Sequence, residues 1–362
     1  MTQSIPMTNV GRAQLRGFVS EGFEALGLTA EVAGIFADAL IFSELRFHPG
    51  QGQGVSRLRR YQQRISSGEV NPRAGWSVIK EGPALAIVDA HNGIGTVAAS
   101  KAMDLAIVKA KENGIGTVIV RNSTHYGSSA VHACRALEHG CIGTAYTNAG
   151  PEMAPWGGRE GATGTNPWAI AAPSDKGFPV VLDIALTTAG KGMMKWYGRE
   201  GRKMPLDWAL TPEGDETDDP SAAMAGYLLG IGGHKGYGLA FMTEATTGVL
   251  SGGGFGLTPY SDPNKLDVSH YVQAIDISWF MDPADYARRM GEFVDMCKTR
   301  ALRPGFNEIL VPGEQEARRT AAKSTNGVPI DNLVLADLQA LGRELGLTTP
   351  IDTLGPYTGT TL

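Results

Sequence analysis

Along the first 80 residues, apolar positions recur every three or four residues, which is the spacing of an amphipathic helix. Val32, Phe36 and Leu40 follow this spacing, and Thr29 precedes them as a residue type that caps helix starts. The pattern predicts three helices: at about 15–26, from Thr29 to before Phe47, and at 55–65. Between the last two, the glycine-rich stretch 47–54 predicts a loop.

From about residue 84 the spacing changes to short apolar runs that alternate with helices, as in a mixed α/β body. The predicted strands cover residues 84–89, 116–120, 142–146, 168–172 and 179–184. The predicted helices of this part and the tail cover 97–111, 237–250, 283–299 and 331–345. The order along the chain is therefore helices, then a mixed α/β body, then helices again.

Composition narrows the class of protein. The chain has 362 residues, of which 42% are hydrophobic and 19% charged, as in ordinary globular proteins. A net charge of −5 without a basic block argues against a nucleic-acid partner. Three cysteines, no signal-peptide pattern and no long apolar run predict a cytoplasmic protein that does not enter a membrane. Its 48 glycines indicate a cleft in which the backbone approaches a cofactor.

One glycine-rich turn has the form of a dinucleotide-binding fingerprint. Residues 93–98 read Gly-Ile-Gly-Thr-Val-Ala after a predicted strand and before a predicted helix, which is the context of a Rossmann loop. Residues 89–92, however, form a polar turn where a Rossmann loop is tighter. An ordinary turn at a helix start is the alternative, and the sequence favours it.

A polar segment, residues 122–127, directly follows the predicted strand 116–120. Strands of α/β proteins place ligands at their carboxyl ends, and His125 titrates in the range of an acid or base. A histidine that caps the next helix is the alternative. His125, His132 and His139 recur every seven residues, about 10.5 Å along a helix, which is too far apart for one metal ion. We therefore predict one helix face that bears three histidines, and no metal site.

Three other glycine-rich segments suit a planar or anionic ligand. Residues 154–160 and 164–167 place two glycine turns around a tryptophan. Residues 232–238 put glycines, His234 and Lys235 at a predicted helix start, where N–H groups and a lysine form an anion cradle. Walker A spacing, a GxSxG elbow and a CxxC pair are absent from the sequence. Nucleotide-triphosphate, hydrolase and thioredoxin chemistry therefore have no support.

Taken together, these segments resemble one family in their order along the chain. The matching segments are 122–127, 154–160, 164–167, 181–183, 207–210, 233–239 and 311–314. They resemble the second type of malate/L-lactate dehydrogenase, a family that includes malate, sulfolactate and ureidoglycolate dehydrogenases, diketogulonate reductase and cyclic ketimine reductases. The likeness covers nearly the whole chain, and seven ordered motifs are far more specific than one fingerprint.

The resemblance implies an α/β fold that is not a Rossmann fold, with a mixed-sheet NAD(P)-binding body and packed N- and C-terminal helical parts. Residues 1–80 together with 318–362 would form a helical domain, and residues 81–317 the NAD(P)-binding domain. It also implies a homodimer, NAD or NADP as the cofactor, and a turn at 93–98 that does not hold the pyrophosphate. The implied cofactor-binding residues are Asp183, Ile184, Ala185, Leu186, Thr187, Thr188, Ala189, His234, Lys235, Gly313, Glu314 and Gln315.

Two residues that handle the substrate are also implied by the resemblance. His125 matches the family histidine that accepts a proton in ureidoglycolate dehydrogenase. Arg57 matches an arginine that holds a substrate carboxylate, and a planar guanidinium suits that group. The expected partner is thus a small carboxylate molecule.

The loop before Arg57 departs from the family. The family has Asp-Ser-His-Gly there, whose histidine donates a proton in several members, whereas this chain has a longer loop that ends Gly52-Gln53-Gly54. Gln53 stands in the substrate-binding loop but cannot donate a proton. His48, five residues upstream, is the reserve candidate for that task. Ala149 replaces a family serine, which removes one hydroxyl contact to the cofactor.

These residues lead us to expect an oxidoreductase that transfers a hydride between a nicotinamide cofactor and a small 2-hydroxy acid/2-oxo acid pair. A reductase of 2-imino acids is the alternative within this class, because a protonated imine needs less help from an enzyme acid. A cofactor-binding protein without turnover is the alternative of another class. We expect His125, rather than Gln53, to exchange the proton, and cofactor binding not to depend on Gly95.

Overall fold

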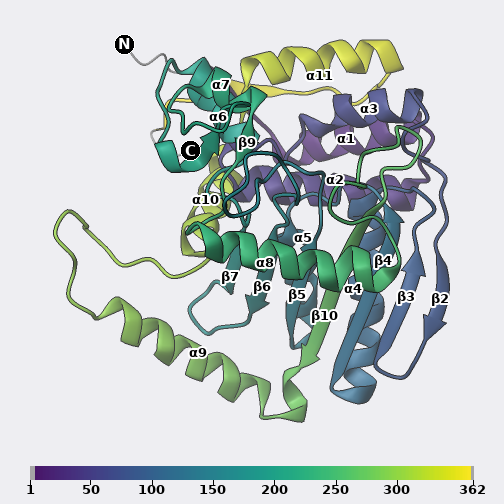
Figure 1. The fold of residues 1–362 in the computed structure, drawn as a ribbon, viewed down its shortest axis with the longest axis vertical. Helices are drawn as coiled ribbons and strands as arrows, with labels where there is room; N and C mark the ends of the chain where they lie inside the picture. The colour runs from purple at the N-terminus through teal and green to yellow at the C-terminus, as the bar shows by residue number, and fades with distance from the viewer. Residues whose placement is uncertain (1–4, 360–362) are drawn as a thin grey trace.

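The computed structural model describes residues 5–359. A seven-stranded mixed sheet runs through its centre (Figure 1). In spatial order its strands are β2 (Ser77–Glu81), β3 (Leu85–Asp89), β4 (Ile115–Ser123), β10 (Val268–Asp276), β5 (Cys141–Thr147), β6 (Trp168–Ala172) and β7 (Val180–Ile184). Within this sheet only β3 and β4 are parallel neighbours. The sheet confirms the predicted α/β class without a doubly wound Rossmann order.

Helices cover both faces of this sheet, and small residues let them approach closely. α4 (Gly95–Asn113) presents alanines, among them Ala106, to one face. A Cβ on Gly116 of β4 would lie 1.9 Å from the Ala106 carbonyl oxygen, so only glycine permits this contact. α8 (His234–Glu244) and the π-helical turn that continues it cover the other face, where Trp168 of β6 donates a hydrogen bond to Thr243.

Both ends of the described chain come together beside the sheet. β1 (Met7–Val10) pairs with β11 (Val328–Asp331) and with β12 (Thr353–Pro356). The helices on this side are α1 (Arg12–Ala25), α2 (Ala30–Arg46), α3 (Arg57–Ser66), α10 (Glu314–Asn326) and α11 (Asn332–Leu345). Thr29 caps α2 by accepting a hydrogen bond from Val32 N–H, as its sequence pattern predicts. The expected boundary at 317/318 falls inside α10, and the division into two domains stays a prediction.

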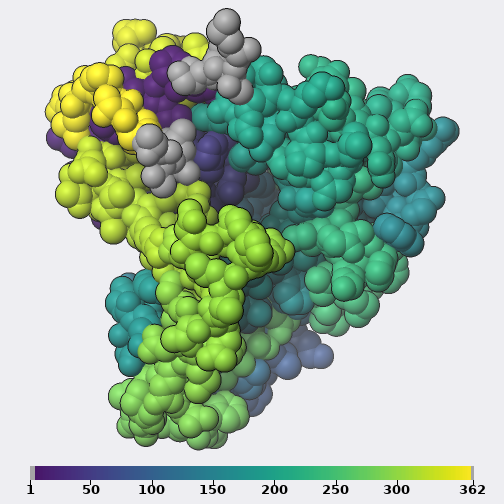
Figure 2. All heavy atoms as spheres, turned by 90° about the vertical axis from the view of Figure 1, so that its left-hand side faces the viewer, coloured from purple at the N-terminus to yellow at the C-terminus, as the bar shows by residue number. Residues whose placement is uncertain are grey.

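The remaining elements connect these layers. They are η1 (Pro49–Gln51), α5 (Ser129–Ala133), η2 (Cys134–His139), α6 (Lys191–Arg199), η3 (Leu206–Trp208), β8 (Ala209–Leu210), α7 (Pro220–Ala225), β9 (Tyr227–Leu228), η4 (Ala245–Val249, the π-helical turn), η5 (Ile277–Trp279) and α9 (Pro283–Lys298). The segment that includes α9 stands as a ridge along one side of the molecule (Figure 2).

The expected helix face with three histidines is wrong. His125 lies in the loop before α5, His132 lies in α5, and His139 ends the 3-10 segment η2. His132 is fully buried, with Nε2 2.9 Å from the Tyr126 carbonyl oxygen, and this contact folds the loop back over the short helix. Within residues 5–359, no three histidine, cysteine, aspartate or glutamate side chains converge as metal ligands would.

Candidate active site

The loop after β4 carries His125 and is held by the turn that begins α4. The Thr124 hydroxyl donates a hydrogen bond to the Gly93 carbonyl (2.9 Å) and accepts one from Gly95 N–H (3.0 Å). A Cβ on Gly95 would lie 2.1 Å from the Thr124 carbonyl oxygen and 2.7 Å from that of His125. The glycine-rich turn at 93–98 therefore supports the His125 backbone, which explains Gly95 without a bound phosphate.

The start of α3 brings the substrate-binding candidates to the same place. Arg57 Nε donates to the Gly52 carbonyl (2.7 Å), and Arg57 Nη2 donates to Gln53 Oε1 (3.2 Å). One turn further along α3, the Tyr61 hydroxyl donates to the His125 carbonyl (2.8 Å). Burial lowers the pKa of Arg57 to about 10, so the guanidinium keeps its charge at neutral pH. Gln53, Arg57 and His125 thus form one cluster, and Tyr61 is a supporting residue that the sequence analysis missed.

The His125 imidazole is neutral at physiological pH. Burial lowers the pKa of His125 well below its usual value, and the charges of Arg57, Arg64 and Arg60 lower it further. Gly127 N–H donates to Nδ1 of the ring (3.2 Å), which leaves the hydrogen of the neutral ring on Nε2. A neutral imidazole is the form that accepts a proton.

The structure places His48 in a different environment. Gly50 N–H donates to His48 Nδ1 (3.0 Å), and the His48 ring meets Trp196 of α6 edge-on, with the ring centroids 4.9 Å apart. Burial lowers the pKa of His48 to about 4. Among the described residues, no hydrogen bond or ring contact joins His48 to Arg57 or His125. The reserve candidate is therefore held by η1 and α6 rather than by the Arg57 cluster.

Two of the expected cofactor segments meet after β7. Thr187 forms an isolated β-bridge with Gly230, and Ile231 N–H donates to the Leu186 carbonyl (2.9 Å). These contacts join the segment 183–189 to the loop that leads into α8. The joined loops place the carboxyl end of β7 beside the start of α8.

His234 and Lys235 are exposed in the first turn of α8. Gly232 and Gly233 precede them with φ angles of +62° and +66°, a backbone conformation that favours glycine. The edge of Trp156 meets the His234 ring, with centroids 5.7 Å apart. An exposed helix start with a lysine fits an anionic group of a cofactor.

The third expected segment lies along the same strand. Gly313 has a φ of +84°, and a Cβ there would lie 2.9 Å from both the backbone N and O of Val181 in β7. The Glu314 carboxylate accepts from Lys298 Nζ at 2.6 and 2.7 Å, which holds the start of α10 in place. Gln315 is exposed. The three segments therefore share β7 as their support.

Asp183 connects the cofactor segments to the His125 loop. Its carboxylate accepts a hydrogen bond from Ala130 N–H (2.9 Å) in α5, five residues after His125. Burial raises the pKa of Asp183 to about 7, and the charge of Arg46 opposes this rise. Arg46 ends α2 and is 7% exposed, with Nε and Nη2 lacking a hydrogen-bond partner among the described residues. Sequence analysis does not single out Arg46, because basic residues at helix ends are common.

Buried polar atoms in these segments fit a nicotinamide dinucleotide. Thr187 Oγ1 and Asn166 Oδ1 lack a hydrogen-bond partner within the described chain, although Thr187 is 2% exposed and Asn166 fully buried. Buried polar atoms ordinarily find a partner, so these two are suited to a ligand. With the cradle at the start of α8, they supply the kind of polar contacts that a dinucleotide uses.

Comparison with known proteins identifies the family and agrees with the fold. Residues 10–339 match the malate/L-lactate dehydrogenase family. A malate dehydrogenase of Pyrococcus abyssi is 37% identical over 347 residues, which cover 93% of this chain and 95% of that protein. The solved malate dehydrogenase of Entamoeba histolytica has a TM-score of 0.91 and 29% identity, and the match covers 95% of this chain and 100% of that one. The Δ1-piperideine-2-carboxylate reductase of Pseudomonas syringae has a TM-score of 0.81 and 28% identity, over 92% of this chain and 99% of that one.

The fold and the site define an oxidoreductase with a mixed-sheet, non-Rossmann body. The chain belongs to the malate/L-lactate dehydrogenase family, which confirms the resemblance seen in its motifs. Membership implies a nicotinamide cofactor and a small-molecule substrate. In the part of the chain that the structure describes, no helix is long and apolar enough to cross a membrane.

Proposed function

We propose that this enzyme transfers a hydride between NAD or NADP and a small 2-hydroxy acid/2-oxo acid pair. The observation that carries the proposal is the single cluster of Arg57, Gln53 and His125, joined through α5 to Asp183. This reaction requires of the protein a group that binds a carboxylate and a group that exchanges a proton. A charged guanidinium and a neutral imidazole in one cluster meet both requirements.

The substrate side works through three residues. Arg57 binds the substrate carboxylate, and Gln53 keeps the guanidinium in place through the contact of 3.2 Å. When a hydroxy acid is oxidised, neutral His125 accepts the hydroxyl proton on Nδ1, the ring nitrogen without hydrogen. This uptake displaces Gly127 N–H, which now contacts that nitrogen at 3.2 Å.

The nicotinamide, when bound, accepts or supplies the hydride. We propose that the cofactor is held by the three segments that the sequence indicates, namely 183–189, His234 with Lys235, and 313–315. Lys235 supplies a positive charge at the α8 start, so Lys235→Ala is expected to weaken cofactor binding by roughly 1.5–3 kcal/mol. Titration of NADH and of NADPH into the wild type and into Lys235→Ala measures this loss of cofactor affinity. Unchanged affinity would remove Lys235 from the cofactor site.

The low pKa of His125 sets the direction of the pH dependence. Oxidation of the hydroxy acid needs the neutral ring, so its kcat/KM is expected to be high at neutral pH and to fall only in acid. Reduction of the oxo acid needs the protonated ring, so its kcat/KM is expected to rise as the pH falls. Measuring kcat/KM against pH in both directions tests these two expectations. A reduction rate that rises with pH would contradict the role of His125 in proton exchange.

A reductase of 2-imino acids is the second candidate function. Gln53 stands where the family has a proton-donating histidine, and a protonated imine brings its own proton. The likeness to a solved piperideine-carboxylate reductase supports this candidate. A cofactor-binding protein without turnover has less support, because Arg57 and His125 are both in place.

A substrate screen separates these readings. Oxidation of NADH and NADPH is followed with pyruvate, with oxaloacetate, each with and without methylamine, and with a cyclic 2-imino acid. Turnover of the oxo acids without methylamine supports the 2-hydroxy acid dehydrogenase. Turnover only with methylamine or with the cyclic imino acid supports the imine reductase. Tight cofactor binding without any turnover would favour a binding protein and overturn both.

Two matched histidine variants test the proton assignment. His125→Asn is expected to lower the rate about 10²–10⁴-fold with little change in cofactor affinity, as loss of a general base does. His48→Asn, at a histidine outside the cluster, is expected to stay within about twofold of the wild type. The reverse result would move the proton exchange to His48. If neither variant affects turnover of an imine, the imine reductase is the better description.

We also propose that the enzyme is cytoplasmic and forms a homodimer. α8 and the turn after it leave apolar side chains 43–61% exposed, namely Leu239, Phe241, Met242, Val249 and Leu250. An apolar patch of this kind is typical of an interface. Light scattering at micromolar concentration is expected to give the mass of two chains, and a single-chain mass would contradict the proposal.

A further inference from the structure

The loop between η4 and β10 holds a tyrosine in a backbone conformation that large side chains rarely adopt. Tyr260 has a φ of +66°. Asn92, Asn122 and Asp267, which contact or flank this loop, have φ angles of +59°, +50° and +53°. A left-handed conformation is tolerated by asparagine and aspartate but costs free energy for a bulky residue. Such strain persists where the surroundings impose it, which is common at functional sites.

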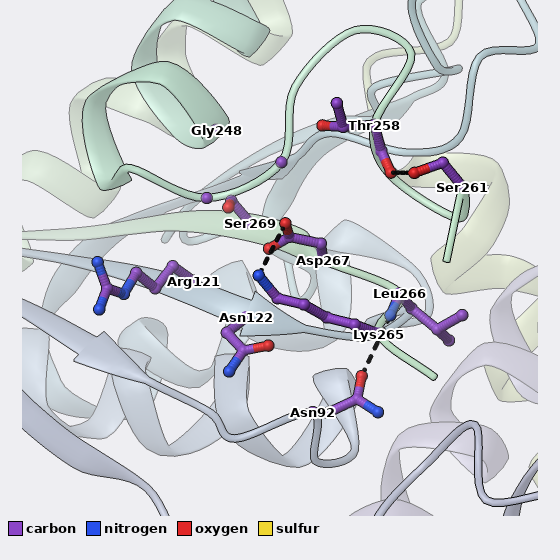
Figure 3. A network of polar contacts seen from close by, with 12 residues as sticks. Asn92, Arg121, Asn122, Gly248, Thr258, Ser261, Lys265, Leu266, Asp267 and Ser269 are labelled. Carbon is purple, nitrogen blue, oxygen red and sulfur yellow. Dashed lines mark hydrogen bonds and ion pairs between the residues drawn. The ribbon is translucent and has the colours of Figure 1, made fainter. Parts of the chain in front are cut away.

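A network of polar contacts imposes this conformation on the loop (Figure 3). Leu266 N–H donates to Asn92 Oδ1 (3.3 Å), and Asn92 Nδ2 donates to the Asn264 carbonyl (3.1 Å). Lys265 and Asp267 form an ion pair at 3.1 Å across the same turn. Leu266 is 3% exposed and belongs to the core of the helical side. The loop is thus anchored firmly next to Tyr260.

The anchored loop places the Tyr260 ring against Gly150 and against Arg64 of α3. The ring packs on Gly150, where a Cβ would lie 3.0 Å from Tyr260 Cδ2. Gly150 follows Ala149, which lies against Gly164 in one of the glycine turns. The Arg64 guanidinium lies over the ring at 5.5 Å from its centroid. The charge of Arg57 also acts on the Tyr260 hydroxyl.

The charged groups that act on the Tyr260 hydroxyl are arginines of α3, of which Arg64 also pairs with Glu69 at 3.5 Å. Arg57 and Arg64 lie seven residues apart on one face of α3, and Arg64 contacts the Tyr260 ring. The Tyr260 phenol is a further donor beside this face, since burial raises its pKa. The Tyr61 hydroxyl, in contrast, is already used on the His125 carbonyl. A phenol donor beside these guanidinium groups is suited to an anion such as a carboxylate.

We propose that Tyr260 is a substrate-binding residue whose hydroxyl donates a hydrogen bond to the same carboxylate that Arg57 binds. This inference rests on the proposed 2-hydroxy acid or 2-imino acid function, because both substrate classes carry that carboxylate. The residue comes from a loop about 200 positions after Arg57 in the chain, so no local motif indicates it.

The test removes the hydroxyl and keeps the ring. Tyr260→Phe is expected to raise the Kd of oxalate, measured by calorimetry on the cofactor complex, about tenfold, as loss of one hydrogen bond to a charged group does. The KM of the accepted oxo or imino acid is expected to rise by a similar factor, with kcat and cofactor affinity nearly unchanged. Tyr286→Phe in α9 is the matched control and is expected to leave all four quantities unchanged.

A double-mutant cycle makes the test sharper. If Arg57 and Tyr260 bind one carboxylate, the effects of Arg57→Lys and Tyr260→Phe on the oxalate Kd are expected to be less than additive. Circular dichroism checks that each variant folds. Should Tyr260→Phe fail to fold, Tyr260→Asn, which accepts a left-handed φ, replaces it with the same expected loss of oxalate affinity.

The outcomes separate this inference from the proposed function. A wild-type enzyme that binds no oxalate and converts no oxo or imino acid overturns both. Normal turnover together with an unchanged oxalate Kd in Tyr260→Phe overturns only the role of Tyr260. A lower melting temperature with unchanged oxalate and substrate affinity would make Tyr260 a structural residue, and a fall in kcat alone would place it in the proton transfer instead.

Discussion

Replacing Asp183 by asparagine is expected to stabilise the cofactor-free enzyme, and to do so more strongly as the pH rises. Asparagine keeps an oxygen that accepts from Ala130 N–H, now 2.9 Å from the carboxylate, but it has no charge to desolvate. Burial raises the pKa of Asp183 from an ordinary value of 3.8 to about 7. Between these values the folded enzyme binds a proton that the unfolded chain does not, so the stability falls as the pH rises through this window.

The size of the effect follows from this shift. Each pKa unit corresponds to about 1.36 kcal/mol, so a rise from 3.8 to about 7 costs the folded state at most roughly 4 kcal/mol above neutral pH. Asp183 is only partly buried by accessible surface, and solvent screening reduces the figure to about 1–3 kcal/mol. The cost accumulates between these two pKa values, so about half of it is already present near pH 5.5 and the rest appears by about pH 8.

Urea unfolding of the cofactor-free enzyme at about pH 5.5 and 8.5 measures the difference. Asp183→Asn is expected to be more stable than the wild type at both pH values, by about twice as much at the higher one, whereas Asp175→Asn, at an exposed carboxylate, shows no such difference. The same variant is expected to bind NADH more weakly, because the carboxylate belongs to the proposed cofactor site. A variant that is less stable than the wild type at both pH values would refute the reasoning, since the Arg46 charge would then outweigh desolvation.

Two further substitutions test the parts of the fold that position the site. Lys323 donates to two carbonyl oxygens at the end of α2, at 2.8 and 2.9 Å, so Lys323→Met is expected to lower the free energy of unfolding by about 2–4 kcal/mol in urea titrations. A Cβ on Gly54 would lie 1.7 Å from Glu44 Oε2, which now accepts from Val55 N–H, so Gly54→Ala is expected to cost about 1–3 kcal/mol and to raise the KM of the carboxylate substrate. Gly75→Ala, at a glycine with open space around it and no left-handed φ, is the control and is expected to leave stability and KM nearly unchanged; an unchanged KM in Gly54→Ala would show that the Glu44 contact does not position the site.

Elements with regular apolar spacing and clear end signals could be predicted from the sequence. β6 was expected at 168–172 and occupies Trp168–Ala172. α9 was expected at 283–299 and occupies Pro283–Lys298, with Asp282 as its cap. In these segments the local preference and the tertiary environment favour the same structure, so local reasoning succeeds.

β10, the central strand, was missed because its buried residues are partly polar. Ser269 and His270 are fully buried in it, where an apolar run would have signalled a strand. His270 is compensated by the Thr147 hydroxyl at 2.7 Å and by the Ser123 hydroxyl at 2.8 Å, both from neighbouring strands. Such compensation depends on contacts between distant segments, so a local pattern cannot reveal it. α6 and α10 were missed as well.

The site residues divide in the same way. His125 and Arg57 could be named from motifs, because each lies in a short segment with a family likeness. Their common location depends on the Tyr61 contact to the His125 carbonyl, and on the packing of Gly95 against the same loop. Tyr260 depends on a distant, anchored loop. Long-range contacts of this kind are properties of the folded chain, not of any window of its sequence.

The replacement of the family histidine by Gln53 is compatible with the proposed proton exchange at His125. Arg57, which Gln53 helps to hold, is the proposed carboxylate ligand and also affects the pKa of His125. Gln53 accepts from Arg57 and so helps to hold the guanidinium, a task that needs no titratable group. The same guanidinium lowers the pKa of His125, second only to burial. In the proposed site, a substrate carboxylate bound by Arg57 would offset the Arg57 charge and so raise the pKa of His125. On this proposal, His125 is a weak base in the free enzyme and becomes a stronger one when the substrate carboxylate binds.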